Sequence, residues 1–273
     1  MSSFKNKIVL VTGGASGIGY LMGLKSLERG AKKLIIWDID EDTLLKAASR
    51  LTKQDFTVQA DVVDISNPVE VQVAAERLKA ENTSVDILFN NAGVVIGENF
   101  ENHSMEDIKK TMDVNSLGLM YAARVFLPEM ISKGEGNIIN IASAAGLTPN
   151  PGMSVYAASK WAAVGWSESL KLEMDKNQTG VKILTVMPSY INTGMFAGVT
   201  TPLLMPLLNP DDISTKILDA VERNKARLRE PFMVKLTPFF RGVLPAKMYD
   251  FVADKIFGVY DSMNTFIGRK KDN

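Results

Sequence analysis

The stretch Lys7-Ile-Val-Leu-Val-Thr-Gly-Gly-Ala-Ser-Gly-Ile-Gly19 decides the fold. Its apolar run, which starts at Ile8, is consecutive, as in a strand that is buried on both faces of a parallel sheet. Gly13, Gly17 and Gly19 follow, and a helical pattern begins at once. Glycines at such a turn let the backbone approach a pyrophosphate at the positive N-terminus of the helix. The stretch therefore predicts the first strand, turn and helix of a dinucleotide-binding domain, with a plain strand-to-helix turn as the alternative.

Short apolar runs alternate with longer helical patterns along the rest of the chain, which is typical of a parallel sheet with helices on both faces. Strands are expected at 7–12, 33–38, 56–61, 85–90, 136–142 and 181–187. Helices are expected at 17–29, 41–51, 67–80, 105–131 (as two helices), 154–176 and 211–225. The pattern predicts an α/β protein with a Rossmann-type doubly wound parallel sheet, in a single domain over residues 1–225.

The composition changes after residue 225, where a C-terminal extension is expected. Residues 226–273 hold 8 of the 21 aromatic side chains, and 9 basic against 5 acidic residues give them a net charge of +4. Their Gly, Pro and aromatic spacing predicts short helices and turns packed on the same domain. Docking on the substrate opening, a dimer interface and contact with a membrane surface stay open as its role. The basic residues that permit membrane contact are Lys235, Arg241, Lys247, Lys255, Arg269, Lys270 and Lys271.

The composition also excludes several classes of function. Basic and acidic residues number 31 each, so the formal net charge is zero and no nucleic acid partner is expected. The chain has no cysteine, and His103 is its single histidine, which argues against thiolate catalysis, a Ser-His-Asp triad and a metal site. No apolar run reaches the ~18 residues of a membrane-spanning helix, and no signal peptide is recognisable. The expected compartment is the cytoplasm, with membrane contact at most peripheral.

An acidic residue, Asp38, ends the second expected strand, 19 residues after Gly19. A carboxylate at this distance from the glycine turn accepts hydrogen bonds from an adenosine ribose, and it repels a 2′-phosphate. Neither Ser16 nor Ile39 supplies the cation that an NADP site needs. The sequence therefore predicts NAD as the cofactor. Capping of the next helix is the alternative role of Asp38, although Asp40 is also placed to cap it.

Three polar side chains further along the chain suit proton transfer to and from an alcohol. Tyr156 and Lys160 are four residues apart, so they share one face of the helix expected at 154–176. An unperturbed tyrosine, with a pKa of about 10, is too weak a base at neutral pH, and the Lys160 ammonium is placed to lower that pKa. Ser143 is placed to hydrogen-bond the substrate oxygen as charge develops there. Taken singly, a Tyr–Lys surface pair and a turn serine are the alternatives.

Together with the glycine turn, these residues resemble the short-chain dehydrogenase/reductase family in residue type, order and spacing. The resemblance covers residues 5 to about 225 and rests on Thr12 to Gly19, Asn90-Asn-Ala-Gly93, Asp113-Val-Asn-Ser116, Ser143 and Tyr156-Ala-Ala-Ser-Lys160. It implies that Tyr156 is the general acid and base and that Ser143 orients the substrate. It also implies that Lys160 holds the nicotinamide ribose, while Asn115 anchors a water that links Lys160 to solvent.

The resemblance further implies the contacts to NAD. The expected cofactor-binding residues are Gly13, Ser16, Gly17, Ile18, Gly19, Asp38, Asp61, Val62, Asn90, Ala92, Gly93, Tyr156, Lys160, Pro188, Ile191 and Thr193. Asp61 and Val62, after the third expected strand, are implied to meet the adenine. Ile191 and Thr193 are implied to bind the nicotinamide carboxamide. The family often has Pro-Gly where this chain has Pro188-Ser189, which is a departure from its pattern.

Residues 189–212 form a long apolar segment at the place where the family has its substrate lid. Pro202, Pro206 and Pro210 disfavour a continuous helix, and the many Leu and Met residues suit an irregular apolar ligand. Packing in the core or at a dimer contact is the alternative role of this substrate loop. Short matches such as Trp37-Asp-Ile-Asp40 resemble the branch that contains retinol and hydroxysteroid dehydrogenases.

The leading interpretation is an NAD-dependent oxidoreductase. It transfers a hydride between NAD(H) and an apolar secondary or allylic alcohol or ketone, which is steroid-, retinoid- or lipid-like. A 3-oxoacyl-carrier reductase is one alternative, disfavoured by Asp38 because such enzymes usually take NADPH. A dinucleotide-binding regulator without turnover is the other, and Tyr156 and Lys160 argue against it. The resemblance implies a homodimer or homotetramer built on the helices near 111–131 and 154–176.

Overall fold

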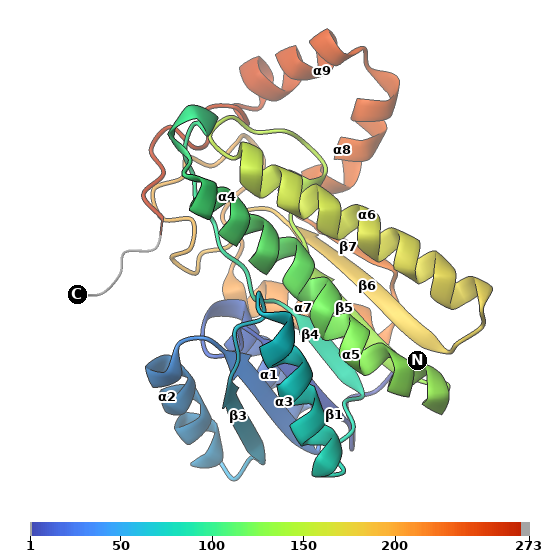
Figure 1. Ribbon diagram of the computed structural model, residues 1–273. Coiled ribbons are helices and arrows are strands. Elements are labelled where there is room, and N and C mark those ends of the chain that lie inside the picture. The colour runs from blue at the N-terminus through green and yellow to red at the C-terminus, as the bar shows by residue number, and fades with distance from the viewer. Residues whose placement is uncertain (1, 269–273) are drawn as a thin grey trace.

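A seven-stranded parallel sheet lies between two layers of helices in the computed structural model, which describes residues 2–268 (Figure 1). The strands are β1 (Ile8–Thr12), β2 (Lys33–Asp38), β3 (Val58–Val62), β4 (Ile87–Asn90), β5 (Gly136–Ile141), β6 (Val181–Pro188) and β7 (Arg227–Glu230). Their order across the sheet is β3-β2-β1-β4-β5-β6-β7, and each neighbouring pair is parallel. The predicted doubly wound Rossmann-type sheet is confirmed. The strand order reverses between β1 and β4, and ligands of such sheets bind at the carboxyl ends of the strands at this point.

The helices follow the predicted ranges within a few residues, with one difference. They are α1 (Gly17–Glu28), α2 (Glu41–Thr52), α3 (Pro68–Ala80), α4 (Met105–Met112), α5 (Gly118–Lys133), α6 (Ser154–Lys176), α7 (Pro210–Glu222), α8 (Phe232–Val243) and α9 (Ala246–Phe251). The two helices expected within 105–131 form one run, because a π-helical turn, Asp113–Leu117, joins α4 to α5. Within residues 2–268, no helix is long and apolar enough to span a bilayer.

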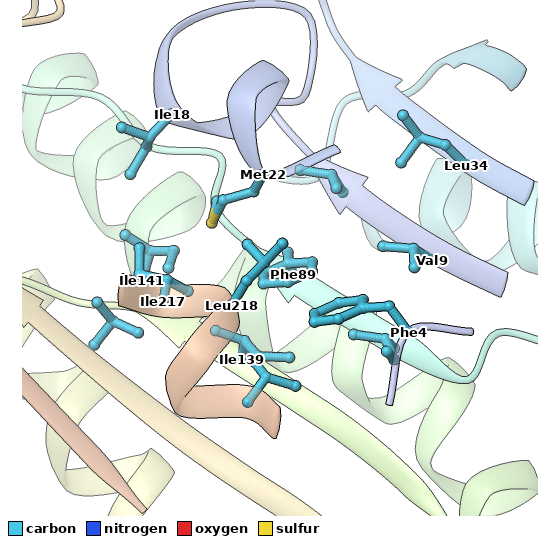
Figure 2. Close-up of a cluster of buried hydrophobic side chains, with 14 of the residues drawn as sticks. Phe4, Val9, Ile18, Met22, Leu34, Phe89, Ile139, Ile141, Ile217 and Leu218 are labelled. Atoms are coloured by element: carbon cyan, nitrogen blue, oxygen red, sulfur yellow. The ribbon is translucent and has the colours of Figure 1, made fainter. Parts of the chain in front are cut away.

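Consecutive residues of the central strands pack in two separate hydrophobic layers, because strand side chains alternate between the two faces of a sheet. Ile36 packs in the layer under α1, α2 and α7, whereas Trp37 packs in the layer under α3, α5 and α6. Figure 2 shows the first layer, where Met22 of α1 and Leu218 of α7 lie against Phe89 of β4. Burying each such side chain contributes roughly 1.5–3 kcal/mol of transfer free energy. The consecutive apolar runs of the sequence therefore hold the sheet from both sides.

The sheet extends beyond residue 225, which is a correction to the sequence analysis. Arg227–Glu230 was expected in the C-terminal extension, but it pairs with β6 as the edge strand β7, in a register that starts with Thr185 opposite Arg227. Only Leu228 of β7 is buried. The apolar signal that marks the central strands is therefore missing from this edge strand, and the sequence did not reveal it.

The rest of the extension packs on the domain beside the start of α6, where α8 and α9 stand at the top of Figure 1. Arg241 of α8 donates to the Leu147 carbonyl over 2.7 Å, and its guanidinium lies 4.6 Å from the ring centre of Trp161. The Tyr249 hydroxyl of α9 hydrogen-bonds that of Thr148 over 2.7 Å. These contacts attach the extension to α6 and to the loop after β5. The predicted basic residues Arg269, Lys270 and Lys271 lie outside the described residues.

Candidate active site

A cleft of about 510 Å³ opens at the carboxyl ends of the strands, at the point where the strand order reverses. The predicted site residues that line it are Gly13, Ser16, Gly17, Ile18, Gly19, Asp38, Ala92, Gly93, Ser143, Tyr156, Lys160, Pro188, Ile191 and Thr193. They come from segments up to 180 residues apart in the chain. The fold therefore brings the glycine turn and the Tyr–Lys pair into one cavity.

The turn after β1 requires glycine for two independent reasons. Gly13 and Gly17 have positive φ angles of 60° and 56°, which favour residues without a side chain. A Cβ atom on Gly13 would lie 2.7 Å from the Ala92 Cα atom, and one on Gly19 would lie 2.2 Å from the Gly13 carbonyl oxygen. The turn therefore has no side chains at its glycines, and its backbone packs closely against Ala92 and against itself. A ligand in the cleft meets main-chain groups instead of side chains.

The first turn of α1 presents its N–H groups to this cleft. Ser16 is the N-cap residue, yet its side chain makes no capping hydrogen bond within the described chain, and the first turn of α1 contains no acidic residue. Helix N-termini leave several N–H donors unsatisfied and carry a partial positive charge, so they bind anions. The residues present therefore fit the diphosphate of a dinucleotide.

The Asp38 carboxylate lies at one end of the cleft and supports the glycine turn. Its Oδ2 atom accepts a hydrogen bond from the Ala15 N–H over 3.0 Å, and its Oδ1 atom accepts one from the Asp40 N–H over 3.2 Å. The N-cap of α2 is Asp40, whose side chain accepts from the Thr43 N–H over 2.9 Å. The alternative role of Asp38 as that cap is therefore wrong. Ile39, next to it, is exposed and also lines the cleft.

Asp61 and Val62 do not reach the cleft, contrary to the sequence analysis. Strand β3 ends at Val62, one residue later than expected, so Asp61 and Val62 are its last two residues. The Asp61 carboxylate pairs with the Arg77 guanidinium over 3.2 Å, and Val62 is exposed. The residues that line the cleft after β3 are Val63, Asp64 and Ile65.

Asn90 is a second correction, because it is buried beneath the cleft instead of lining it. Its Nδ2 atom donates to the Leu119 carbonyl over 3.2 Å and to Asn140 Oδ1 over 2.8 Å. The next residue, Asn91, lines the cleft, and its Nδ2 atom donates to the carbonyls of Thr12 and Gly13 over 3.0 Å. Consecutive side chains at a strand end point in opposite directions, which is why Asn90 is buried while Asn91 faces the cleft. The hydrogen bonds of Asn91 hold the glycine turn in place.

Tyr156 and Lys160 lie together at the other end of the cleft, on the first turns of α6. Both are buried, and Lys160 Nζ lies 5.6 Å from the centre of the Tyr156 ring and donates to the Ile141 carbonyl over 3.1 Å. Burial raises the pKa of Tyr156 above its ordinary value, and a hydrogen bond with Ser143 offsets part of this rise. Burial lowers the pKa of Lys160 to about 8. The expected lowering of the Tyr156 pKa is thus opposed by desolvation.

Asn115 sits in the π-helical turn between α4 and α5, buried beside the cleft. Its Oδ1 atom accepts from the Val94 N–H over 2.8 Å, and its Nδ2 atom donates to the Val94 carbonyl over 2.8 Å and to Ser159 Oγ over 3.1 Å. The side chain thus ties this turn to the segment after β4 and to α6. A Cβ atom on Gly93 would lie 3.1 Å from Asn115 Oδ1 and 3.7 Å from Lys160 Nζ, so Asn115 and Lys160 flank the same glycine.

A smaller chamber, of about 50 Å³, adjoins the cleft and shares Ser143, Ser189 and Phe196 with it. Its other lining residues are Ala144, Ala145, Thr148, Asn150, Met153, Tyr190, Pro202, Met205, Val234, Thr237 and Val259. They come from the loop after β5, the substrate loop and the C-terminal extension. Phe196 belongs to the expected apolar substrate loop, and it packs edge-on against Tyr156 with ring centres 6.1 Å apart, a contact that the sequence did not reveal.

Known proteins resemble the chain over most of its length. A model of the short chain dehydrogenase family matches residues 7–203. The chain is 37% identical to mouse (Mus musculus) epidermal retinol dehydrogenase 2 over 269 residues, which is 97% of this chain and 86% of that protein. It is 32% identical to estradiol 17-beta-dehydrogenase 11 from Pongo abelii over 262 residues, which is 96% of this chain and 87% of that protein.

The chain belongs to the short-chain dehydrogenase family. The predicted resemblance to the branch of retinol and hydroxysteroid dehydrogenases is also confirmed. A crystal structure of a Burkholderia phymatum short chain dehydrogenase/reductase in complex with NAD superposes with a TM-score of 0.81 at 28% identity, covering 89% of this chain and 95% of that chain. The protein is therefore an oxidoreductase of this family, and the glycine turn and the Tyr–Lys pair line one cleft of it.

Proposed function

We propose that this dehydrogenase transfers a hydride between NAD(H) and an apolar secondary or allylic alcohol or its ketone, of steroid-, retinoid- or lipid-like character. One observation carries the proposal: Tyr156 and Asp38 line the same cleft, and Ser143, to which Tyr156 is hydrogen-bonded, also lines the adjoining chamber of mostly apolar side chains. The NAD-bound relative and the relatives named for retinol and estradiol support the same choice of cofactor and substrate class.

Each catalytic residue has a separate task in the proposed reaction. NAD, when bound, accepts the hydride from the carbinol carbon or returns it as NADH. Tyr156 moves the proton of the substrate oxygen, and Ser143 hydrogen-bonds that oxygen as its charge changes. The Lys160 ammonium, 5.6 Å from the Tyr156 ring, stabilises the phenolate electrostatically. We further propose that Asn115 holds the water through which Lys160 exchanges protons with solvent.

The substrate class is tested with a panel of alcohols of increasing apolar size, from aliphatic secondary alcohols to retinoids and steroids, together with sugar alcohols as polar members. NADH formation in the presence of NAD is followed by absorbance. We expect kcat/KM to rise with the apolar area of the alcohol, because the chamber wall removes that area from water. Equal or higher efficiency with sugar alcohols would contradict the proposed substrate class.

We expect NAD to be preferred over NADP by at least about tenfold in kcat/KM, or about 1.4 kcal/mol. The Asp38 carboxylate lies where the 2′-phosphate of NADP would be repelled. The double substitution Asp38→Ala with Ile39→Arg should narrow or reverse the ratio, because position 39 is exposed and lines the cleft. Ile39→Arg alone is the matched control and should keep a preference for NAD. Equal efficiency with NADP in the unmodified enzyme would contradict the assignment.

The pH dependence of ketone reduction should report the ionisation of Lys160, whose pKa is about 8. Below that pH the side chain is an ammonium that stabilises the phenolate left when Tyr156 donates its proton. Above it the amine is neutral and this stabilisation is lost. The raised pKa of Tyr156 keeps its own proton in place over the same range. We therefore expect kcat/KM for NADH-dependent reduction to fall as the pH rises through about 8.

The matching variant is Lys160→Ala, which should reduce slowly at every pH and lose this inflection. Its affinity for NADH should also fall, because we propose that Lys160 binds the nicotinamide ribose. An unchanged inflection in Lys160→Ala would assign the ionisation to another group.

We also propose that the enzyme is a homodimer or homotetramer built on α5 and α6. Leu117, Ile131 and Leu172 are exposed apolar residues on or beside these helices, and a Cβ atom on Gly165 would meet nothing within 4 Å. Leu170 of α6 is buried in the core and takes no part in this surface. Light scattering at micromolar concentration should give two or four times the 29.9 kDa chain mass. A mass near 29.9 kDa would refute the proposal.

A further inference from the structure

The boundary between the cleft and the chamber is formed by the three residues that line both, Ser143, Ser189 and Phe196. Two of these are serines, so Phe196 is the one bulky side chain of the three. Ser143 is also hydrogen-bonded to Tyr156, and the proposed reaction has the substrate oxygen at these two hydroxyls. A substituent of the carbinol carbon that enters the chamber from there has to pass the Phe196 ring.

The Phe196 ring packs against two tyrosines. Its centre lies 6.1 Å from that of Tyr156 and 5.2 Å from that of Tyr190, and the rings meet edge to face, with interplanar angles of 79° and 69°. Such edge-to-face contacts are a favoured arrangement of aromatic rings. Tyr156 belongs to α6 and Tyr190 follows β6. The ring is therefore held between two elements that carry the site.

Tyr190 is itself fixed in position by a polar cluster. Asn150 Nδ2 donates to the Tyr190 hydroxyl over 3.0 Å and to Ser262 Oγ over 2.9 Å, and the two hydroxyls are 2.8 Å apart. Asn150 and Ser262 are buried, and they come from the loop after β5 and from the C-terminal extension. Breaking hydrogen bonds between buried groups is costly, so the Tyr190 ring does not move away from Phe196 easily.

The backbone that follows Phe196 is attached to the C-terminal extension as well. The Ala197 carbonyl accepts a hydrogen bond from the Ile267 N–H over 2.9 Å. The Gly198 carbonyl accepts one from the Thr265 hydroxyl over 2.6 Å. Both the ring and the adjoining backbone are thus held, which makes Phe196 a fixed part of the boundary.

The chamber beyond Phe196 is narrow. Its volume is about 50 Å³. Each water-sized group needs at least roughly 10–15 Å³ of such a cavity, which leaves room for about three to five groups of that size. Much of the wall is apolar and includes Met153, Met205 and Val234. This space suits a slim apolar chain better than a chain that branches beside the carbinol carbon.

We infer that Phe196 is a specificity-determining residue, which limits the substituent in the chamber to one that is unbranched at the carbon next to the carbinol carbon. The other substituent stays outside the chamber and is not limited by this ring. The inference rests on the proposed function. A branch at that carbon meets the fixed Phe196 ring, and a clash of this kind discriminates against one substrate without strengthening the contacts to another.

A pair of isomeric ketones tests the inference. Cyclohexyl n-propyl ketone and cyclohexyl isopropyl ketone have the same composition, but only the second is branched on both sides of the carbonyl carbon. With the enzyme and NADH, kcat/KM should be at least about tenfold higher for the n-propyl isomer. Phe196→Ala should lower this ratio at least about fivefold by accelerating the isopropyl isomer, and Phe196→Leu should lower it less. Branching also slows hydride transfer by itself, so the change of the ratio between variants is the decisive quantity.

Leu203→Ala is the matched control. Leu203 is an exposed residue of the same substrate loop and lines neither cavity. The substitution truncates an apolar side chain, as Phe196→Ala does, and should leave the ratio unchanged. A fall of the ratio in Leu203→Ala as large as that in Phe196→Ala would assign the effect to the loop in general and overturn the inference.

The remaining outcomes separate the inference from the proposed function. Equal changes of kcat/KM for both isomers in Phe196→Ala would indicate a structural role of the ring and overturn the inference alone. So would equal reduction of both isomers by the unmodified enzyme, or reduction of other apolar ketones but neither isomer. If the unmodified enzyme reduces no apolar ketone at all, the proposed function falls as well. If Phe196→Ala does not fold, Phe196→Leu decides by the same ratio.

Discussion

Tyr156→Phe is expected to reduce kcat by roughly 10²–10⁴, the range that general acid–base catalysis contributes. The substitution removes only the hydroxyl that exchanges a proton with the substrate. The ring keeps its packing against Phe196, with ring centres 6.1 Å apart. The glycine turn and Asp38 lie at the other end of the cleft, so NADH affinity should change little.

Two measurements check this expectation: steady-state turnover with the best alcohol of the panel, and NADH binding by fluorescence titration. Tyr121→Phe makes the same chemical change on α5, outside the residues that line the cleft, and should keep normal turnover. Substantial turnover by Tyr156→Phe would refute the assignment of Tyr156 as the acid and base. A loss of NADH binding would mean that the residue acts mainly through the cofactor site.

Gly19→Ala should abolish dinucleotide binding. The new Cβ atom would lie 2.2 Å from the Gly13 carbonyl oxygen and 2.5 Å from Asn91 Nδ2. Because the first of these is a backbone atom, either α1 must move away from the turn or the turn must change shape. Both changes would displace the N–H groups that we propose bind the diphosphate. Overpacking of this kind typically costs about 1–3 kcal/mol of stability, so the variant should also unfold at a lower temperature.

Gly242→Ala is the matched control, because a Cβ atom there would meet nothing within 4 Å among residues 2–268. It lies in α8, where alanine is a better helix former than glycine by about 1 kcal/mol, so stability should not fall. NADH titration and thermal unfolding of both variants test the prediction. Normal NADH affinity in Gly19→Ala would show that the close approach of α1 to the turn is not required for binding.

The sequence reveals those parts of the fold whose residues are buried on both sides. The strand at Ile8–Thr12 and the central strands beside it have consecutive apolar residues, and no other environment suits such runs as well. Strand β7 has only Leu228 buried, since the edge of a sheet needs one covered face. The strand forms because it pairs with β6, and the sequence of Arg227–Glu230 by itself gives no sign of that pairing.

The sequence predicts which side chains lie close together where their proximity depends on spacing within one element, and predicts it less well where it depends on the residue at which a strand ends. Tyr156 and Lys160 share a helix face, so their sequence separation determines their proximity. Asp61 and Val62 were assigned to the cleft by the family resemblance, with the strand expected to end at Asp61, whereas β3 ends at Val62. A shift of this size moves a different set of side chains to the sheet edge.

Contacts between distant segments were not predictable at all. The cluster of Asn150, Tyr190 and Ser262 joins residues up to 112 positions apart, and each of them alone is an ordinary loop residue. Only the folded chain shows that, within residues 2–268, the Asn150 Oδ1 atom has no hydrogen-bond partner. Polar contacts between distant segments of a site are therefore harder to infer from sequence than a motif within one helix.

Hydride transfer from an apolar alcohol to NAD in this cleft is tested most directly with a deuterium label on the carbinol carbon. The enzyme is incubated with NAD and the labelled form of the best alcohol from the panel, and the reduced dinucleotide is analysed by mass spectrometry. The proposed mechanism predicts deuterium-labelled NADH with the unmodified enzyme and almost none with Tyr156→Phe. Unlabelled NADH, or an unmodified enzyme that forms no NADH from any alcohol while it binds the cofactor, would contradict it.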